Sequence, residues 1–228
     1  MVWNSGGNHR VHQVTRDFVT RSTNPKWAVA NDEIGPASWG APVDGQTTGS
    51  GYTQEEVRKY VLWGHLLAGG FGVEYYYGYS TGCSDLTCED HRSRANLYEK
   101  TKYAIQFFDQ IPNAIVPRLE NLNASVNNPN HNQNRYCLGS DADLFYLVYL
   151  HNGGSTTLNL PANGVGTYTV QWFNPRTGQT NAPIALTSNG LALALTAPTA
   201  NNDWTARIEQ AAGGGCTQTI VFYRDNDN

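Results

Sequence analysis

Apolar residues recur at helical spacing in three segments of the first half of the chain. Apolar positions about three or four residues apart predict amphipathic α-helices. The first helix should end before Asn24, which precedes a proline, and the second should begin at the capping box that starts with Thr53. The third should cover about 93–111 and end at Pro112. The residues expected on the three apolar faces are Val11, Val14 and Phe18, then Val57, Tyr60, Val61 and Leu67, then Leu97, Ala104, Ile105 and Phe108.

Two short apolar runs lie between these helices and predict β-strands, one at 27–31 and the other at about 70–77. The resulting order, helix–strand–helix–strand–helix, is typical of parallel strands joined by crossover helices. We therefore expect residues 1–120 to form an α/β unit. A closed (β/α)₈ barrel needs about 250 residues, so this unit cannot close one by itself.

The second half of the chain has a different pattern, with short strands separated by turns. Residues 121–137 are rich in asparagine, which predicts a linker or long loop. The strands after it recur at the spacing of an antiparallel β-sandwich, which we expect to cover 138–228 with Trp172 and Trp204 in its core. The predicted fold class is thus α/β plus all-β. The expected strands are 144–150, 155–160, 167–173, 182–186, 191–195, 204–208 and 218–224.

Composition and charge indicate which class of molecule the protein contacts. Only 15% of the 228 residues are charged and the formal net charge is −4, whereas glycine, tyrosine and tryptophan are plentiful. This profile is typical of an extracellular protein that contacts carbohydrate, and it argues against nucleic acid, which requires a basic surface. No apolar run approaches the ~20 residues of a membrane-spanning helix. The first residues lack the pattern of a signal peptide, so either a signal was removed or the sequence starts inside a longer chain.

The four cysteines favour a secreted protein. Cys83 and Cys88 flank one short polar loop, and Cys137 and Cys216 both lie in the strand-rich half. We predict these two pairs as disulfides, which persist outside the cell. A zinc site built from all four is the alternative, but neither pair has the roughly two-residue spacing of common zinc motifs, and His91 is the only imidazole nearby.

Two adjacent carboxylates follow the strand expected at 27–31. Carboxylates are depleted inside sheets, whereas the carboxyl ends of parallel strands are where active sites assemble. Glycosidases work with pairs of carboxylates, so Glu33 is the candidate catalytic residue. Asp32 points to the opposite face and is expected beside the substrate, where it orients a neighbour. In the alternative interpretation, one of the two only caps the turn through Gly35.

Further candidates for substrate contact lie around the second strand. Glu74 is suited to accept hydrogen bonds from sugar hydroxyls, or it forms an ion pair with Arg92 or Arg94. His9 either touches substrate or is a loop histidine without a role. Aromatic rings stack well on the C–H faces of sugars, and the candidates for this contact are Trp39, Tyr75, Tyr77 and Tyr79.

An acidic cluster at Asp85, Glu89 and Asp90 has the oxygen ligands that calcium prefers. It lacks the spacing of an EF-hand loop, and a solvated acidic loop is the favoured interpretation. We therefore expect neither a metal nor another cofactor.

Longer segments of the chain carry a family resemblance. They are KWAVANDEIGPASWGAPVD at 26–44, LWGHLLAGGFGVEYYYGY at 62–79, EDHRSRANLYEKTKYAIQFF at 89–108, LFYLVYLHNGGSTTLNLP at 144–161, YTVQWFNPRTG at 168–178 and the pair Asp203-Trp204. Together, and in this order, they resemble the apiosidase-like glycoside hydrolases. Those are bacterial proteins in which a (β/α)₈ barrel is followed by a β-sandwich, often described as a collagen-binding domain.

The resemblance implies that residues 1–120 are the last three β/α units of such a barrel. Glu33 would end the seventh strand as the nucleophile, and His9 would lie near the end of the sixth. The first five units are missing from this sequence, together with the strand that supplies the general acid. This implies a fragment of a secreted hydrolase that acts on a polysaccharide or its side chains. The missing barrel portion or other copies of the chain would complete it, and these 228 residues alone should be inactive. The alternative is a non-catalytic extracellular protein that binds carbohydrate or protein through the sandwich.

Overall fold

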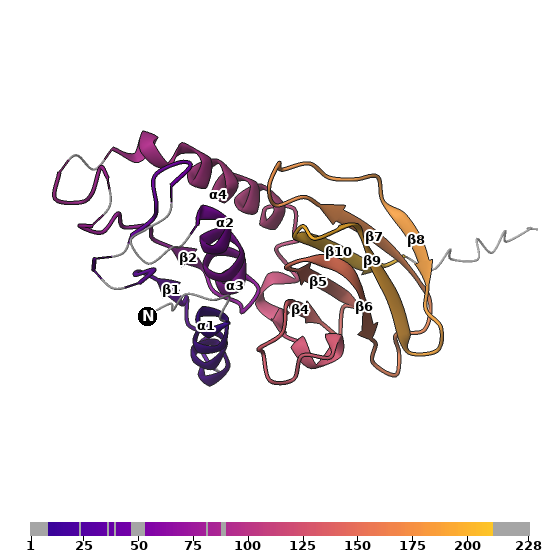
Figure 1. Ribbon diagram of the computed structural model, residues 1–228. Coiled ribbons are helices and arrows are strands. Elements are labelled where there is room, and N and C mark those ends of the chain that lie inside the picture. The colour runs from indigo at the N-terminus through magenta and orange to yellow at the C-terminus, as the bar shows by residue number, and fades with distance from the viewer. Residues whose placement is uncertain are drawn as a thin grey trace, which may run out of the picture.

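The chain folds into an α/β unit followed by an antiparallel β-sandwich (Figure 1). This arrangement is seen in a computed structural model that describes residues 9–22, 24–35, 37–38, 40–46, 53–80, 82–87 and 90–211. The expected mixture of helices and antiparallel strands is therefore confirmed.

The described residues of the α/β unit form three helical segments and two short strands. In chain order they are α1 (Arg10–Arg21), β1 (Ala30–Asn31), a helical segment made of α2 (Gln54–Glu56), the π-helix η1 (Val57–Leu62) and α3 (Trp63–Leu66), then β2 (Gly72–Val73), the 3₁₀ turn η2 (His91–Arg94) and α4 (Ala95–Phe108).

The predicted capping box begins the middle helix. The Glu56 amide donates to the Thr53 hydroxyl at 3.2 Å, and the Thr53 amide donates to the Glu56 carboxylate at 2.9 Å. Both interactions satisfy amides that lack a partner at a helix start. The helix then continues through η1, a π-helical stretch, and such stretches are frequent at functional sites.

The buried faces of the outer helices differ in part from the prediction. In α1 the buried residues are Val11, His12 and Thr15, whereas Phe18 is exposed. In α4, Ile105 is 56% exposed, and its predicted place in the core is taken by Phe107. In α1 the shift follows from polar partners, because His12 Nδ1 donates to the Gly64 carbonyl and the Thr15 hydroxyl bonds to His65, both at 2.8 Å. The buried face of α4 remains apolar. The buried residues of α4 are Leu97, Ala104 and Phe107.

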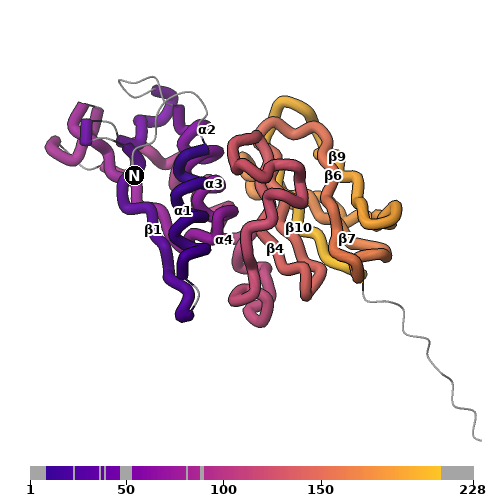
Figure 2. Tube along the Cα trace, turned by 90° about the horizontal axis from the view of Figure 1, so that it is seen from below, coloured from indigo at the N-terminus to yellow at the C-terminus, as the bar shows by residue number. Residues whose placement is uncertain are grey.

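The two strands of the α/β unit are parallel, as expected. Ala30 pairs with Gly72 and Asn31 with Val73. The helices lie between this strand pair and the sandwich, which is clearest when the molecule is seen from below (Figure 2). The described residues contain one such parallel pair, so the assignment to the last three units of a barrel stays a proposal.

As far as residue 211, the sandwich comprises a six-stranded sheet in the order β3-β4-β5-β10-β7-β8 and a separate pair, β6-β9. All neighbouring strands are antiparallel. The predicted strand 218–224 lies outside the described residues. The strands are β3 (Glu120–Asn121), β4 (Arg135–Ser140), β5 (Phe145–Leu150), β6 (Gly153–Asn159), β7 (Thr167–Phe173), β8 (Ile184–Thr187), β9 (Ala192–Ala200) and β10 (Trp204–Gln210), with the 3₁₀ turns η3 (Val116–Arg118) and η4 (Asn123–Val126) near the start.

Both faces of the larger sheet are covered, which explains the uninterrupted apolar run in β5. One face packs on β6 and β9 and forms a core that includes Trp172 and Trp204, as predicted. The other face packs on the helices, where the Trp63 ring stacks on Tyr149 at 5.4 Å between centroids. A strand with two buried faces has no place for alternating polar residues.

The asparagine-rich segment expected as a linker or long loop is packed into the sandwich. It begins in β3 and ends in β4, and the side chains of Asn123 and Asn128 within it are fully buried. A domain boundary before residue 138 would cut through β4. The structure therefore adds β3 and all of β4 to the larger sheet.

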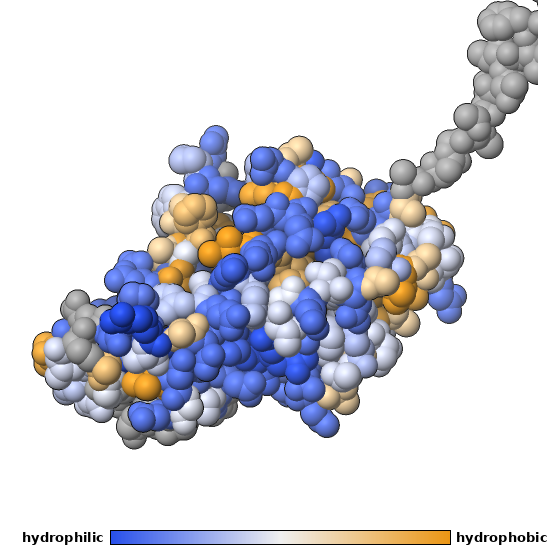
Figure 3. Space-filling model, turned by 90° about the horizontal axis from the view of Figure 1, so that it is seen from above, coloured by the Kyte–Doolittle hydropathy of each residue, from blue (hydrophilic) through white to orange (hydrophobic). Residues whose placement is uncertain are grey.

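Within the described residues, no helix has the length and apolar character needed to cross a membrane. The face seen from above is mostly hydrophilic, with apolar side chains gathered in small areas (Figure 3).

Candidate functional site

Three acidic residues directly follow the ends of β1 and β2. Asp32 and Glu33 follow β1 directly, and Glu74 follows β2. The parallel register brings these positions to the same edge, and the Glu74 amide donates to the Asn31 carbonyl at 3.0 Å. All three side chains are exposed. Carboxylates that follow adjoining strand ends and face solvent are accessible to a ligand at this edge.

Asp32 and Glu33 line a cavity of about 620 Å³ between α1 and β1. The wall from α1 consists of Arg10, Val14 and Phe18. The expected apolar face of α1 is thus split, because Val11 packs inward while Val14 and Phe18 border this cavity.

Tyr76 is the aromatic residue that accompanies Glu33. Its hydroxyl donates to the Gly35 carbonyl, in the turn that follows Glu33. Burial, with the nearby charges of Glu33 and Asp85, raises the pKa of Tyr76 to about 12. The phenol therefore stays protonated and can donate a hydrogen bond. Sequence reasoning did not select Tyr76, although it has the same strand parity as Glu74 and thus shares its face.

Tyr75 and Tyr77 face the opposite way, into the core of the α/β unit. Their exposed fractions are 8% and 6%, and they pack in a cluster with residues of η1 and α4. The Thr101 hydroxyl donates to that of Tyr75 at 3.1 Å, and the hydroxyls of Tyr77 and Tyr98 lie 3.0 Å apart. The sequence predicted that both rings would be available to stack on a sugar. In the structure both rings are instead buried in the core.

The remaining candidates for substrate contact have different surroundings. Tyr79 is 57% exposed and open to stacking, whereas Trp39 lies outside the described residues. Neither proposed arginine pairs with Glu74 in the described part of the chain. Arg92 pairs with Asp90 at 2.9 Å, and Arg94 donates to the carbonyls of Ala41, Gly82 and Cys83.

His9 lies away from these carboxylates, at the junction with the sandwich. Its Nδ1 bonds to the Tyr136 hydroxyl, and burial lowers its pKa to about 4. The imidazole is therefore neutral at physiological pH. It lines a second cavity that shares no residue with the one beside Glu33.

His65, which sequence reasoning missed, fixes the strand that leads to Asp32. Its Nε2 donates to the Val29 carbonyl at 3.0 Å, and its Nδ1 accepts from the Thr15 hydroxyl at 2.8 Å. A carbonyl can only accept, which determines this tautomer. Burial lowers the pKa of His65 to about 4, so it acts as a neutral bridge between α1 and the residues before β1.

The acidic cluster considered as a calcium site includes a carboxylate that bonds to the backbone. The Asp85 carboxylate accepts from the amides of Tyr77 and Gly78 at 2.9–3.1 Å and so caps a turn. Glu89 lies outside the described residues, within which no group of three potential ligands could hold a metal ion.

The two cysteines that the structure describes differ in burial. Cys83 is half-buried, whereas Cys137 is fully buried in the sandwich core. Their expected partners, Cys88 and Cys216, also lie outside the described part, so both disulfides stay predictions.

Comparison with known families and structures agrees with this architecture. Residues 122–208 match a family described as "Putative collagen-binding domain of a collagenase". Two solved structures align with 86% of this chain at a TM-score of 0.61 each. One is a "Glycoside hydrolase" at 14% identity, and the other is a family 5 glycoside hydrolase from Bacteroides vulgatus ATCC 8482 at 16% identity. The aligned part is 46% and 45% of those chains, so this chain spans less than half their length. No curated protein matches it.

Proposed function

We propose that this chain is part of a secreted glycoside hydrolase that acts on a polysaccharide or its side chains, with Glu33 as the catalytic nucleophile. The observation that carries the proposal is the pair of exposed carboxylates, Asp32 and Glu33, which border a cavity at the carboxyl end of a parallel strand. The shared fold with two glycoside hydrolase structures supports it.

The residues around Glu33 have complementary roles in this proposal. Tyr76, protonated over the whole physiological range, positions the turn after Glu33 through its bond to Gly35. Glu74 accepts hydrogen bonds from sugar hydroxyls, and Tyr79 offers a ring on which a sugar can stack. The general acid is supplied from outside these 228 residues, by the rest of the barrel.

The test uses the full-length protein in which this chain is joined to the rest of the barrel. Release of reducing sugar is measured on a panel of neutral and acidic plant polysaccharides. Glu33→Gln keeps the shape of the side chain but removes the nucleophilic charge, so turnover should fall by orders of magnitude. In Glu33→Ala, azide should occupy the vacated space and attack the anomeric carbon as the leaving sugar departs, which forms a glycosyl azide that is detected by mass spectrometry because it has no reducing end.

Glu74→Gln is the matched control, because it removes an exposed carboxylate at the neighbouring strand end. We expect it mainly to raise KM, since it weakens a substrate contact and leaves the nucleophile in place. Near-normal turnover by Glu33→Gln on every substrate that the unchanged protein cleaves would refute the assignment.

A second candidate function is binding without catalysis. It is favoured by the fact that the family match falls on the sandwich and not on the α/β unit. Binding of the 228-residue chain to immobilised fibrillar collagen and to insoluble polysaccharide, measured side by side, distinguishes a protein ligand from a carbohydrate ligand.

A further inference from the structure

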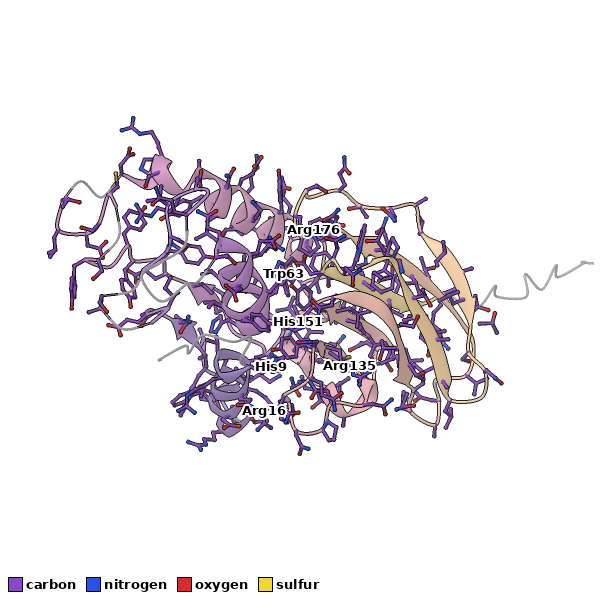
Figure 4. The ribbon with its side chains drawn as sticks, viewed as in Figure 1. His9, Arg16, Trp63, Arg135, His151 and Arg176 are labelled. Atoms are coloured by element: carbon purple, nitrogen blue, oxygen red, sulfur yellow. The ribbon has the colours of Figure 1, made fainter. Side chains whose placement is uncertain are left out.

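The second cavity, of about 590 Å³, lies where the α/β unit meets the sandwich. His9 and Tyr60 line it from the α/β side, and the sandwich side includes Asn134, Arg135 and Asn152. Figure 4 shows His9, His151 and Arg135 at this junction. None of the described residues that line the cavity has a carboxylate, and its walls consist mainly of amides, one guanidinium and aromatic rings.

The sandwich wall is held in shape by one buried side chain. The Asn128 amide is fully buried, and its oxygen accepts from the backbone amides of Asn132 and Gln133 at 2.9 and 3.1 Å. Its nitrogen donates to the Arg135 carbonyl at 2.7 Å. His131 has a φ of 56°, a left-handed conformation that is uncommon outside glycine. Such conformations persist where the surrounding structure imposes them, so this wall is formed before any ligand arrives.

The polar groups on this wall are free to bind a ligand. Within the described residues, the side-chain amides of Asn132, Asn134 and Asn152 have no hydrogen bond to protein, and all three residues are exposed. Arg135 donates to the Gln133 side chain, and it has no ion pair with any residue that the structure describes. Each amide offers a donor and an acceptor side by side, which matches adjacent hydroxyls on a sugar ring.

The opposite wall is aromatic and firmly supported. The Tyr60 ring stacks on His151 at 5.0 Å between centroids. His151 is fully buried and packs edge-on against Tyr136 and Tyr149 at 4.6 and 4.8 Å. The half-buried Tyr60 therefore presents a fixed ring to the cavity, and rigid aromatic surfaces suit sugar C–H groups.

From this arrangement we propose that the junction cavity binds a segment of an oligosaccharide chain. The amides of Asn134 and Asn152 and the guanidinium of Arg135 contact its hydroxyls, and Tyr60 packs against a ring face. The site is distinct from the carboxylates at β1 and β2, and it does not require Glu33 to be catalytic. It would hold a polysaccharide at the point where the two parts of the chain join.

Calorimetric titration of the 228-residue chain tests the proposal, with cellohexaose, xylohexaose and a galacturonan hexamer as probes. At least one probe should bind. Asn134→Ala and Asn152→Ala should each weaken that binding about tenfold, the size of effect expected from losing hydrogen bonds to a ligand. Asn181→Ala is the matched control, because it removes an exposed asparagine that does not line the cavity and should leave Kd unchanged. Thermal unfolding of each variant verifies that it is folded.

Glu33→Gln separates this site from the proposed active site. If the junction cavity is the binding site, the Kd of the hexasaccharide should be the same in Glu33→Gln as in the unchanged chain, whether or not Glu33 is catalytic. The proposal is overturned if no probe binds at millimolar concentration. It is also overturned if Glu33→Gln weakens binding while both cavity variants leave it unchanged.

Discussion

Replacing Asp203 with asparagine tests how the α/β unit is held against the sandwich. Asp203 lies just before β10 and is fully buried, and its carboxylate oxygens accept from Arg58 in η1 at 2.9 and 3.1 Å. The Arg58 side chain is fully buried as well. The Tyr149 hydroxyl donates to the same carboxylate at 2.9 Å, and the Arg176 guanidinium lies 3.5 Å from it.

The substitution keeps the size of the side chain but removes the charge that compensates two guanidinium groups. Removing one partner of a buried ion pair costs about 3–5 kcal/mol, because the remaining charge stays in a poorly solvating site without compensation. Asparagine retains one oxygen that can accept from Arg58. We therefore expect a loss of about 3 kcal/mol in the free energy of unfolding, near the lower end of that range.

Urea unfolding followed by tryptophan fluorescence measures this loss. Trp63 follows Arg58 by five residues and lies in the core between the helices and the larger sheet, whereas Trp204 follows Asp203 directly and lies in the sandwich core. Asp143→Asn is the matched control. Arg118 holds Asp143 by two hydrogen bonds at 2.6 and 2.7 Å, but both side chains are partly exposed. Exposed pairs contribute little, so this variant should be much less destabilised. Equal effects of the two substitutions would refute the reasoning.

Two further predictions concern buried histidines. Gly70→Ala would place a Cβ 2.2 Å from Nε2 of His65, so the free energy of unfolding measured in urea should fall by about 1–3 kcal/mol. Gly72→Ala is the control and should have little effect, because no atom lies within 4 Å of its Cβ. Comparable losses in the two variants would contradict this prediction. Burial lowers the pKa of His9 to about 4 and that of His12 to about 3, so below about pH 6.5 the unfolded chain binds more protons than the folded one. The free energy of unfolding should therefore fall as the pH drops from about 6.5 through 4 toward 3, by about 1.4 kcal/mol per pH unit for each histidine protonated only in the unfolded state, and a flat profile from urea titrations across this range would refute it.

Elements whose determinants are close together in the sequence were predictable. The capping box at Thr53 begins a helix because the interacting groups are only three residues apart. The strand at 167–173 has the bounds expected from its alternating pattern. The placement of Asp32 and Glu33 just after a short strand also follows from local chemistry, since carboxylates are unfavourable inside a sheet.

The orientation of side chains toward the candidate site was not predictable in the same way. Alternation along a strand determines that Tyr75 and Tyr77 share one face and that Tyr76 takes the other. It does not determine which face the helices cover. Packing of η1 and α4 buries Tyr75 and Tyr77, and so leaves Tyr76 on the side of Glu33.

The asparagine-rich segment at 121–137 shows most clearly what local sequence determines and what tertiary packing decides. Its composition determined that regular structure would be interrupted there, because asparagine competes for backbone hydrogen bonds. Only the tertiary structure decided that Asn123 is a buried anchor, bonded to His12 across 111 residues at 2.8 Å, while Asn134 lines a cavity. The sequence by itself determines elements and their polarity through near neighbours. Which polar side chains are buried and which remain available to a ligand depends on contacts between distant segments, and these exist only once the chain has folded.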